Sequence, residues 1–402
     1  MKIAIIGAGI IGVTTAYELA ADGHEVHVFE RRNSACEETS FANAGVISPG
    51  YVTPWAAPGM PSQILKYLLQ KHAPVRIKLP FKHGELGWVS QWLKACKPAV
   101  YASTRHQLQS LASYSAIRLQ SLTKTLDLEY DKAQGYMVLL RSEQEFNHIQ
   151  ANLKVLADTG VDYKILDAEA ARKIEPALST GTALHAALHL PDDMVANCRQ
   201  FALLLREKAQ SLGAKFHFGT VQNRIEHSPQ GIRLGSEEFD HIVVCAGVDS
   251  KGLLQPLGIH VPLIPVYGYS VSAPVREPMD APISGVMDER YKVAISRIGN
   301  RVRVAGSAEI GGDPTRINQN VIQTLYKVLD DWFPAAADTK RQVQIWKGAR
   351  PMLPSGPPRV GASGVPNVWI NLGHGSSGWA LACGSARLLA DKIAGRKPTI
   401  DL

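Results

Sequence analysis

The chain has 402 residues, of which 45% are hydrophobic and 20% charged, and its formal net charge is +7. This composition is that of an ordinary globular protein, and the length favours two domains over one. It excludes a membrane-spanning helix, because no apolar run approaches the roughly 18 residues needed, and it lacks the Lys/Arg blocks with interleaved aromatics that nucleic-acid-binding proteins carry.

The first motif is a glycine-rich loop between an expected strand and an expected helix. Lys2–Ile6 is typical of a buried strand, Gly7-Ala-Gly9-Ile-Ile-Gly12 follows it, and residues 13–19 have a helical pattern. A second apolar run, residues 25–29, ends on Glu30, about 20 residues past the glycines, where dinucleotide-binding folds place an acidic residue. There the first glycine makes a tight turn, the second lets a pyrophosphate approach the backbone, and the third lets helix and strand pack closely. The sequence therefore predicts a dinucleotide site, with phosphates at the helix N-terminus and Glu30 on the ribose hydroxyls.

A long loop of small and polar residues, 38–51, comes next, and a loop of this length is unusual unless it is functional. Residues 54–61 contain too many prolines for a helix or a central strand. Two short apolar helical stretches, residues 64–69 and 86–93, then follow among lysines and arginines.

The rest of the chain alternates expected helices and strands. Helices are expected at 103–126, 166–178, 201–212 and 379–395, and strands at 135–140, 215–218, 240–247, 269–272, 292–296, 301–305 and 367–372. We predict an α/β protein in which a Rossmann-like dinucleotide-binding domain is interleaved with an antiparallel-sheet (α+β) substrate domain. The expected ranges are 1–50, 165–250 and 345–402 for the first domain, and 51–164 and 251–344 for the second.

Two later segments could also meet a cofactor. The buried run 240–247 ends on the small residues Ala246 and Gly247, against which a cofactor can lie, although a core strand followed by a turn explains them equally well. Gly373-His-Gly-Ser-Ser-Gly378 forms a second strand-to-helix junction, and a helix N-terminus there suits a site of developing negative charge. A glycine-rich loop that only makes a sharp turn is the alternative.

Arg350 lies in the run Gly348-Ala-Arg-Pro351, between a glycine and a proline and upstream of the last expected strand. A guanidinium can hold a carboxylate by two parallel hydrogen bonds, so Arg350 is a candidate for binding an acidic group of a substrate. A solvated arginine in a loop is the simpler explanation for an arginine taken alone.

The cysteines and the N-terminus indicate the compartment. The five cysteines are scattered, with no spacing that suits zinc, so we expect reduced thiols and no metal site. The first apolar run leads directly into the glycine loop, so we expect a strand there and not a signal peptide. The chain is therefore expected in the cytoplasm or peripherally on the cytoplasmic face of the inner membrane.

Together these motifs resemble the FAD-dependent D-amino-acid oxidase/dehydrogenase family, in particular its bacterial D-amino-acid dehydrogenase (small-subunit) members. The resemblance covers nearly all of the chain, and within it the segment Ser40–Gly59 is the most specific. It is carried by the N-terminal glycine motif and by the runs Glu38–Gly59, Pro265–Ser270, Met287–Lys292, Gly348–Pro351 and Gly373–Gly375. Family members end in a longer tail than this chain, which stops at Leu402, so any membrane attachment through that tail is in doubt.

The resemblance implies a non-covalent FAD and the residues that hold it. Contacts to the flavin and its diphosphate are implied for Thr39, Ser40, Asn43, Ala44, Gly45, Val46 and Ile47, and a backbone contact to the adenine for Val221. The glycine loops and strand ends add Gly7, Gly9, Ile10, Ile11, Gly12, Glu30, Arg31, Ala246, Gly247, Gly373, His374, Gly375, Ser376, Ser377 and Gly378.

The resemblance also implies the substrate side of the site. Arg350 would bind the amino-acid carboxylate, Tyr269 would place a second hydroxyl on it, and Tyr51 and Tyr291 would line the pocket. Each tyrosine is equally well explained as a core aromatic with a satisfied hydroxyl.

The implied activity is oxidative deamination of D-amino acids by hydride transfer from Cα to FAD, with electrons passed to a quinone or another respiratory-chain acceptor. The stretch 60–97, with Tyr67, Trp88 and Trp92 among lysines, is typical of a membrane-surface element but equally of a helical lid. An oxygen-using oxidase of glycine, secondary amines or D-amino acids is the alternative enzyme, and a non-enzymatic FAD- or NAD-binding module is the alternative class. An NAD-dependent dehydrogenase is disfavoured, because nicotinamide would not need the extra contacts at 39–47 and 373–378. The preferred amino acid and the oligomeric state do not follow from the sequence.

Overall fold

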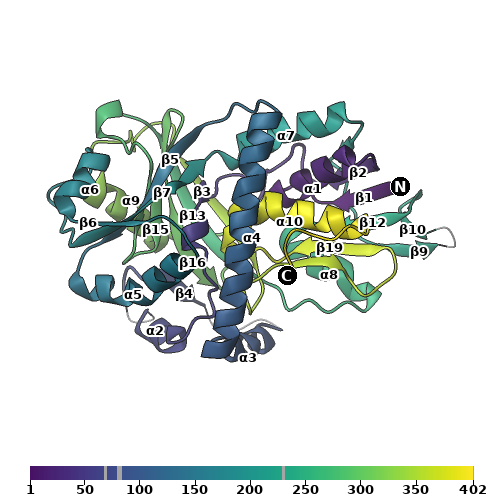
Figure 1. The fold of residues 1–402 in the computed structure, drawn as a ribbon, viewed down its shortest axis with the longest axis horizontal. Coiled ribbons are helices and arrows are strands. Elements are labelled where there is room, and N and C mark those ends of the chain that lie inside the picture. Colours follow the sequence, from purple (N-terminus) through teal and green to yellow (C-terminus); the bar gives the residue numbers. More distant parts are fainter. Residues whose placement is uncertain (68–69, 79–83, 229–230, 402) are drawn as a thin grey trace.

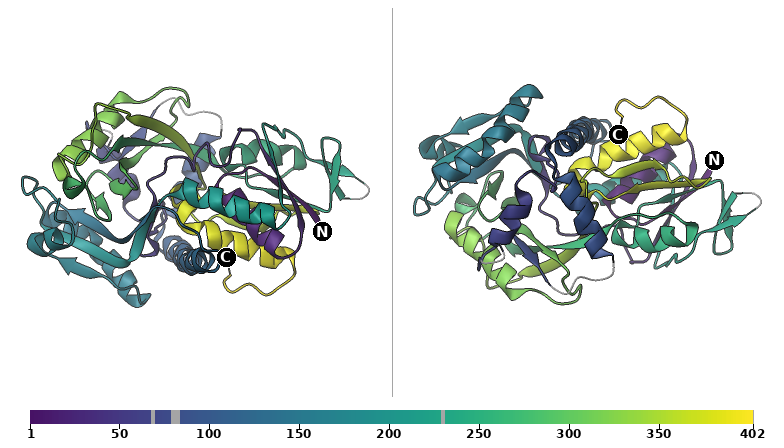
Figure 2. Two further views of the ribbon diagram at one scale, coloured as in Figure 1. Left: turned by 90° about the horizontal axis from the view of Figure 1, so that it is seen from above. Right: turned by 90° about the horizontal axis from the view of Figure 1, so that it is seen from below.

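The structure is a computed structural model that describes residues 1–67, 70–78, 84–228 and 231–401. Its elements form two parts side by side, with the long helix α4 (Pro98–Thr125) running across the front of Figure 1 between them. The N-terminal strand and the C-terminal helix lie in the same part, on the right in Figure 1, and Figure 2 shows this arrangement from above and below.

The part that holds the N-terminus is built on a mostly parallel sheet. Over the described residues its strand order is β18-β19-β12-β1-β2-β8, and all neighbours are parallel except β18 and β19. In β1, Ile3 and Ile5 pack into one core while Ala4 and Ile6 pack into another on the opposite face. A parallel strand covered on both faces is apolar at nearly every position, which explains the unbroken apolar run. The strands are β1 (Lys2–Ile6), β2 (Glu25–Glu30), β8 (Lys215–Phe218), β12 (His241–Val244), β18 (Arg359–Ala362) and β19 (Val368–Leu372).

Helices cover one face of this sheet, and a short helix with a small antiparallel sheet covers the other. The first face carries α1 (Ile10–Ala21), α7 (Cys198–Ser211) and α10 (Gly378–Ile393). The second face carries α8 (Ser250–Leu254) and strands β9 (Glu226–Ser228), β10 (Gly231–Leu234) and β11 (Glu237–Phe239). This is a Rossmann-like architecture, as the sequence predicts.

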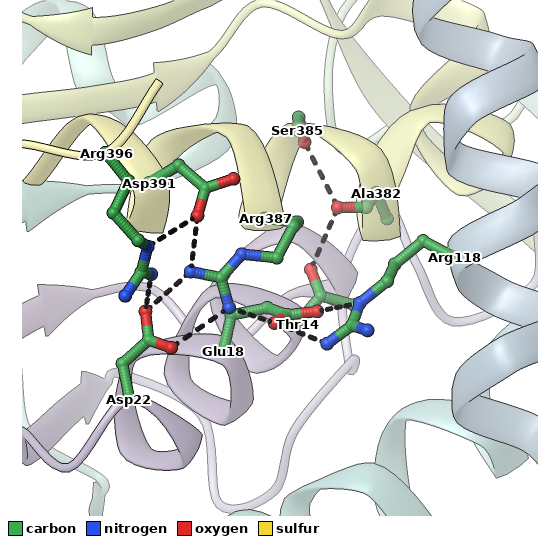
Figure 3. Close-up of polar contacts among 9 residues, drawn as sticks. All are labelled: Thr14, Glu18, Asp22, Arg118, Ala382, Ser385, Arg387, Asp391 and Arg396. Atoms are coloured by element: carbon green, nitrogen blue, oxygen red, sulfur yellow. Dashed lines mark hydrogen bonds and ion pairs between the residues drawn. The ribbon is translucent and has the colours of Figure 1, made fainter. Parts of the chain in front are cut away.

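A buried carboxylate joins helices from distant parts of the chain (Figure 3). Glu18 of α1 is fully buried and accepts two hydrogen bonds from Arg118 of α4, of 2.7 and 2.8 Å, and one of 2.8 Å from Arg387 of α10. Arg387 also pairs with Asp22 at 2.5 Å and with Asp391 at 3.0 Å. The network therefore fixes both α10 and α4 onto α1.

The second part is built on a larger, mostly antiparallel sheet. Its strand order over the described residues is β17-β13-β16-β15-β14-β5-β7-β3, with β4 paired to β16 and β6 to β7. The strands are β3 (Val46–Ile47), β4 (Val75–Ile77), β5 (Lys132–Leu140), β6 (Lys164–Leu166), β7 (Ala186–Ala196), β13 (Ile264–Pro274), β14 (Gly285–Asp288), β15 (Val293–Ile298), β16 (Arg301–Ile310) and β17 (Gln344–Met352). Helix α9 (Gln319–Trp332) packs on one face of this sheet, and α3 (Glu85–Ala95) packs on the other. The remaining helices are α2 (Met60–Tyr67), α5 (Glu143–Asp158) and α6 (Ala168–Ile174).

The pairing of the strands shifts the expected division of the chain. Strand β7 falls in the range 165–250, and most of β17 in the range 345–402, both expected in the FAD-binding domain. Both instead pair in the second sheet, β7 with β5 and β17 with β13. The sequence pattern does not reveal this, because a strand's partner is set by distant residues and not by its own periodicity. Helices α5 and α9, and β17 around Arg350, were likewise not predicted.

The stretch 60–97 forms helices α2 and α3 with β4 between them, and residues 68–69 and 79–83 of it lie outside the described residues. Trp88 and Trp92 are buried at 3% and 6% exposure, and Trp88 Nε1 donates a 3.0 Å hydrogen bond to the carbonyl oxygen of Met352. These two tryptophans are therefore core residues, which agrees with the helical lid, one of the two explanations that the sequence left open, and not with tryptophans that face a membrane. On α3 the exposed apolar side chains are Leu86 and Leu93. Across the described residues, no helix combines the length and the hydropathy needed to cross a bilayer.

Candidate cofactor and substrate site

The loop after β1 needs its glycines for two different reasons. Gly7 has a φ of 102°, and a Cβ on it would lie 2.7 Å from the carbonyl oxygen of Cys245. A Cβ on Gly12 would overlap the carbonyl oxygen of Gly7, so helix α1 can pack this close only without a side chain there. Gly9, in contrast, has an ordinary φ of −66°, and a Cβ on it would meet only Ser40 Oγ, at 3.4 Å. The space over Gly9 is therefore open to a ligand.

Glu30 and Ser40 hold this loop from two sides. Glu30 Oε2 accepts a 2.7 Å hydrogen bond from the backbone nitrogen of Ala8, and Oε1 accepts one of 2.8 Å from that of Arg32. Ser40 Oγ accepts a 3.1 Å hydrogen bond from the backbone nitrogen of Ile10, the first residue of α1. The acidic residue and the loop after it thus brace the glycine turn, and each carboxylate oxygen keeps a further lone pair for a ligand.

A cavity of about 1160 Å³ connects the glycine loop with the other predicted segments. The predicted residues that line it are Gly7, Gly9, Ile10, Ile11, Glu30, Arg31, Thr39, Ser40, Val221, Ala246, Gly247, Gly373, His374, Gly375 and Gly378. Residues separated by up to about 370 positions in the sequence therefore face one space, which is large for a small-molecule site.

Other predicted cofactor residues are not among those that line this cavity. Gly12 is packed under the turn, and Ser376 and Ser377 belong to the short 3₁₀ turn Gly375–Ser377 that precedes α10. Residues 43–47 are attached to the second sheet. The carbonyl oxygens of Asn43 and Ala44 accept hydrogen bonds from the side chains of Arg303 and Ser296, respectively. Val46 and Ile47 pair with β7. A Cβ on Gly45 would lie 2.9 Å from the carbonyl oxygen of Ala196.

The second glycine loop carries a buried histidine. His374 is 4% exposed, and its Nε2 lies 3.0 Å from Ser385 Oγ of α10. Burial lowers the pKa of His374 to about 3, so the imidazole is neutral at physiological pH. Gly373 and Gly375 have φ values of 82° and 58°, which a residue with a side chain rarely adopts. The junction is therefore a neutral turn that presents the N-terminal end of α10 to the cavity.

Arg350 is on β17, with its guanidinium over Gly268 of β13. A Cβ on Gly268 would lie 2.6 Å from Arg350 Cζ, and Arg350 Nη1 donates a 2.7 Å hydrogen bond to the carbonyl oxygen of Ser307. Burial alone lowers the pKa of Arg350 to about 10, so the group stays charged. Among the described residues no carboxylate pairs with it. A part-buried cation without a counter-ion is the expected property of an anion-binding group.

The three predicted tyrosines are placed differently from Arg350. Tyr269 pairs with Lys347 in the β13–β17 register, whereas Arg350 pairs with Val266, so the two side chains leave opposite faces of the sheet. The Tyr269 hydroxyl donates a 3.1 Å hydrogen bond to the fully buried Glu309, and is not available on the Arg350 face.

The other two tyrosines contact charged residues. Tyr51 donates a hydrogen bond to Glu289 and accepts one of 3.1 Å from Lys292. The ring of Tyr291 lies 5.2 Å from the guanidinium of Arg141. Both have partners within the fold, and their expected place in the pocket wall stays a prediction.

Two residues were not assigned a role from the sequence. The indole of Trp346 covers Gly348 and lines the cavity, and Ser307 contacts Arg350. Trp346 stands four residues before Arg350, so that motif could have drawn attention to it. Ser307 has no sequence signal, because its role depends on a strand irregularity.

The site suits a long ligand with a diphosphate and two ring systems. Two helix N-termini, those of α1 and α10, meet the cavity, and the open space over Gly9 is the cradle that a pyrophosphate needs. Arg350 lies beside it in the second sheet. These residues fit FAD.

Known proteins resemble the chain over its full length. The family model described as "FAD dependent oxidoreductase" (DAO) matches residues 2–392. The chain is 42% identical to a D-amino acid dehydrogenase of Allorhizobium ampelinum, over 100% of this chain and 96% of that protein. It is 40% identical to a D-amino acid dehydrogenase of Bradyrhizobium diazoefficiens, over 100% of this chain and 97% of that protein. Among solved structures, glycine oxidase from Geobacillus kaustophilus superimposes with a TM-score of 0.78 at 20% identity, covering 100% of this chain and 96% of that one. L-proline dehydrogenase from P. horikoshii gives 0.73 at 17%, covering 99% and 94%.

Proposed function

The chain belongs to the FAD-dependent oxidoreductase (DAO) family, and from this premise we propose that it oxidises D-amino acids to 2-oxo acids and ammonia. FAD is its cofactor. Two relatives that are 40–42% identical over the full length carry the name D-amino acid dehydrogenase, which supports the substrate class. The observation that carries the proposal is Arg350, a part-buried guanidinium with no carboxylate partner among the described residues, whose chain neighbours Ala349 and Pro351 line the cofactor cavity.

Bound FAD supplies the two-electron acceptor for the hydride that leaves Cα. Arg350 holds the substrate carboxylate and so fixes the direction of the Cα–H bond. The amine must be neutral, because its lone pair forms the imine as the hydride departs. His374 lines the cavity, and its neutral imidazole is hydrogen-bonded to Ser385. Direct hydride transfer does not require a general base, so His374 does not need to remove a proton from the substrate. Water then hydrolyses the released imino acid to the 2-oxo acid and ammonia.

The test is anaerobic reduction of the purified flavoprotein with a panel of D- and L-amino acids, followed by addition of quinone and then of oxygen. We expect bleaching with D-amino acids only, and faster reoxidation by quinone than by oxygen. Arg350→Leu should keep its flavin but lose kcat/KM by a factor of about 100 or more, the cost of removing a charged hydrogen-bond donor. Fast reoxidation by oxygen with peroxide release would instead support an oxidase, and a flavin that no amino acid reduces would contradict the proposal.

The proposed acceptor is a quinone, reached by peripheral contact of helices α2 and α3 with the cytoplasmic face of the inner membrane. Leu86 and Leu93 are seven residues apart on α3, hence on one face, and are 67% and 48% exposed. Leu65 of α2 is 66% exposed, and Lys94 and Lys97 are also at the surface. Exposed leucines beside lysines suit an anionic lipid surface, and the net charge of +7 has the matching sign.

A further inference from the structure

The strand β16 is irregular opposite Gly268. In the pairing of β13 with β16, Tyr267 pairs with Glu309 and Tyr269 pairs with Gly306. One residue of β13, Gly268, therefore opposes two residues of β16, Ser307 and Ala308, which is a β-bulge. Such bulges redirect a backbone group or a side chain and are frequent beside active sites.

Ser307 has the backbone conformation of the bulge. Its φ is 60°, in the left-handed region that serine adopts at a cost. This conformation places its carbonyl oxygen 2.7 Å from Arg350 Nη1, the one hydrogen bond that the structure gives this guanidinium among the described residues. The strained residue therefore fixes the group that is proposed to bind substrate.

Ser307 also carries a hydroxyl without a partner. The residue is 8% exposed, and its Oγ is fully buried with no hydrogen bond to any described residue. A buried hydroxyl left unpaired costs free energy, so a group outside the chain, either a ligand or a water, is expected to pair with it. Tyr269, expected to supply the second hydroxyl, is engaged by Glu309 on the opposite face of the sheet.

Gly268 completes this arrangement by leaving room. Its φ is not positive, so any residue could adopt its backbone conformation, and glycine is required only for space. A side chain at this position would occupy the place of the Arg350 guanidinium. Gly268, which has no side chain, and the bulge at Ser307 thus together form a preformed binding place for the guanidinium.

We propose that Ser307 completes the carboxylate subsite: its carbonyl oxygen positions Arg350, and its hydroxyl donates a hydrogen bond to the substrate carboxylate. This inference rests on the proposed oxidation of amino acids. Arg350 and Ser307 together give the carboxylate three donors from two strands, β17 and β16, which fixes the orientation of Cα more strictly than one guanidinium can.

The test measures ligand affinity of the FAD-loaded protein by perturbation of the flavin absorbance under anaerobic conditions. Propionate probes the carboxylate subsite, and isopropylamine, which has no carboxylate, is the matched control ligand. Ser307→Gly removes the hydroxyl but suits the positive φ and keeps the carbonyl, so Arg350 stays in place. We expect its Kd for propionate to rise about tenfold or more, as for loss of one hydrogen bond to a charged group, with the Kd for isopropylamine unchanged.

Two further variants separate the roles of the groups. Ser307→Ala should weaken propionate binding as much as Ser307→Gly, while Gly268→Ala should nearly abolish it by displacing the guanidinium. Gly87→Ala, where the added Cβ meets nothing within 4 Å, should leave it unchanged. Wild-type affinity for propionate in Ser307→Gly would overturn the inference if D-alanine still reduces the flavin. If no amino acid reduced the flavin of the wild-type protein, the proposed function would be overturned, and this inference with it.

Discussion

Gly268 and Gly348 lie directly opposite each other on β13 and β17, and the space over each is filled by the side chain of another residue. The guanidinium of Arg350 lies over Gly268, and the indole of Trp346 lies over Gly348. The two glycines thereby place a guanidinium and an aromatic ring side by side on one face of the sheet, because directly opposite residues share a face.

We expect Gly348→Ala to push the Trp346 indole from its place. Overpacking of this kind costs about 1–3 kcal/mol, and because the indole lines the cavity the variant should also lose flavin. In a Trp346→Leu background the same glycine change should cost almost nothing, since the clashing ring is gone. Urea unfolding and flavin content of the four proteins of this cycle provide the measurement. Additive effects of the two changes would contradict the assignment.

The first glycine loop allows a sharp comparison of two neighbouring positions. Gly9→Ala adds a Cβ into open space, so the protein without cofactor should keep its stability within about 1 kcal/mol while its affinity for FAD falls. Gly12→Ala places a Cβ on the carbonyl oxygen of Gly7 and should lower stability and FAD affinity together. Thermal unfolding before and after addition of FAD distinguishes them. Equal loss of stability in both variants would refute the distinction.

Glu18 should be a major determinant of stability. Glu18→Gln removes the negative charge that Arg118 and Arg387 share, and breaking a buried ion pair costs about 3–5 kcal/mol. The control is Glu169→Gln on α6, whose partner Lys173 is 73% exposed and whose loss should cost less than about 0.5 kcal/mol. Urea midpoints of the two variants test this. A small effect at Glu18 would show that α10 and α4 are held by apolar packing alone.

Asp193 gives the stability a pH dependence that can be isolated. It is 4% exposed on β7, with a hydrogen bond from Ser48 Oγ, and burial raises its pKa from 3.8 to about 7. Between about pH 4 and pH 7 the folded protein keeps the proton on Asp193 while the unfolded chain releases it. The contribution of Asp193 to the free energy of unfolding therefore falls as the pH rises through this window. The slope is at most about 1.4 kcal/mol per pH unit.

Asp193→Asn should therefore become more stable relative to the parent protein as the pH rises from 4 to 7. Above pH 7 the difference in free energy of unfolding between the two proteins should stay constant. The comparison with the parent is needed because His374, with a lowered pKa of about 3, contributes the opposite slope below pH 6.5. Unfolding midpoints measured from pH 4 to 8 give the difference curve. Parallel curves for the two proteins would exclude a buried, protonated Asp193.

The exposed leucines of α3 test the proposed membrane contact. Leu86→Ser with Leu93→Ser should lower binding to anionic lipid vesicles and the rate of quinone reduction, while dye-linked activity stays unchanged. Leu212→Ser changes a leucine of similar exposure, 49%, at the end of α7 and should affect none of the three. If dye-linked activity fell together with quinone reduction, α3 would be a structural lid and not a membrane contact.

The sequence alone was enough to predict the cofactor half of the candidate site. Gly7, Gly9, Gly12 and Glu30 act within one strand–loop–helix–strand unit, where turn, helix start and strand end follow from neighbouring residues. The second loop, Gly373–Gly378, is local in the same way. That both loops open onto one cavity follows from parallel strands, whose carboxyl ends meet at one edge of the sheet.

Only the tertiary structure decided the substrate half. Tyr269 and Arg350 are both in matching motifs, but strand side chains alternate between faces, and the register of β13 against β17 sends the tyrosine to the face opposite the arginine. Ser307 obtains its role from one extra residue in β16, which turns its carbonyl oxygen to Arg350. Register and bulges are fixed by the packing of whole strands against each other, and no short stretch of sequence contains that information.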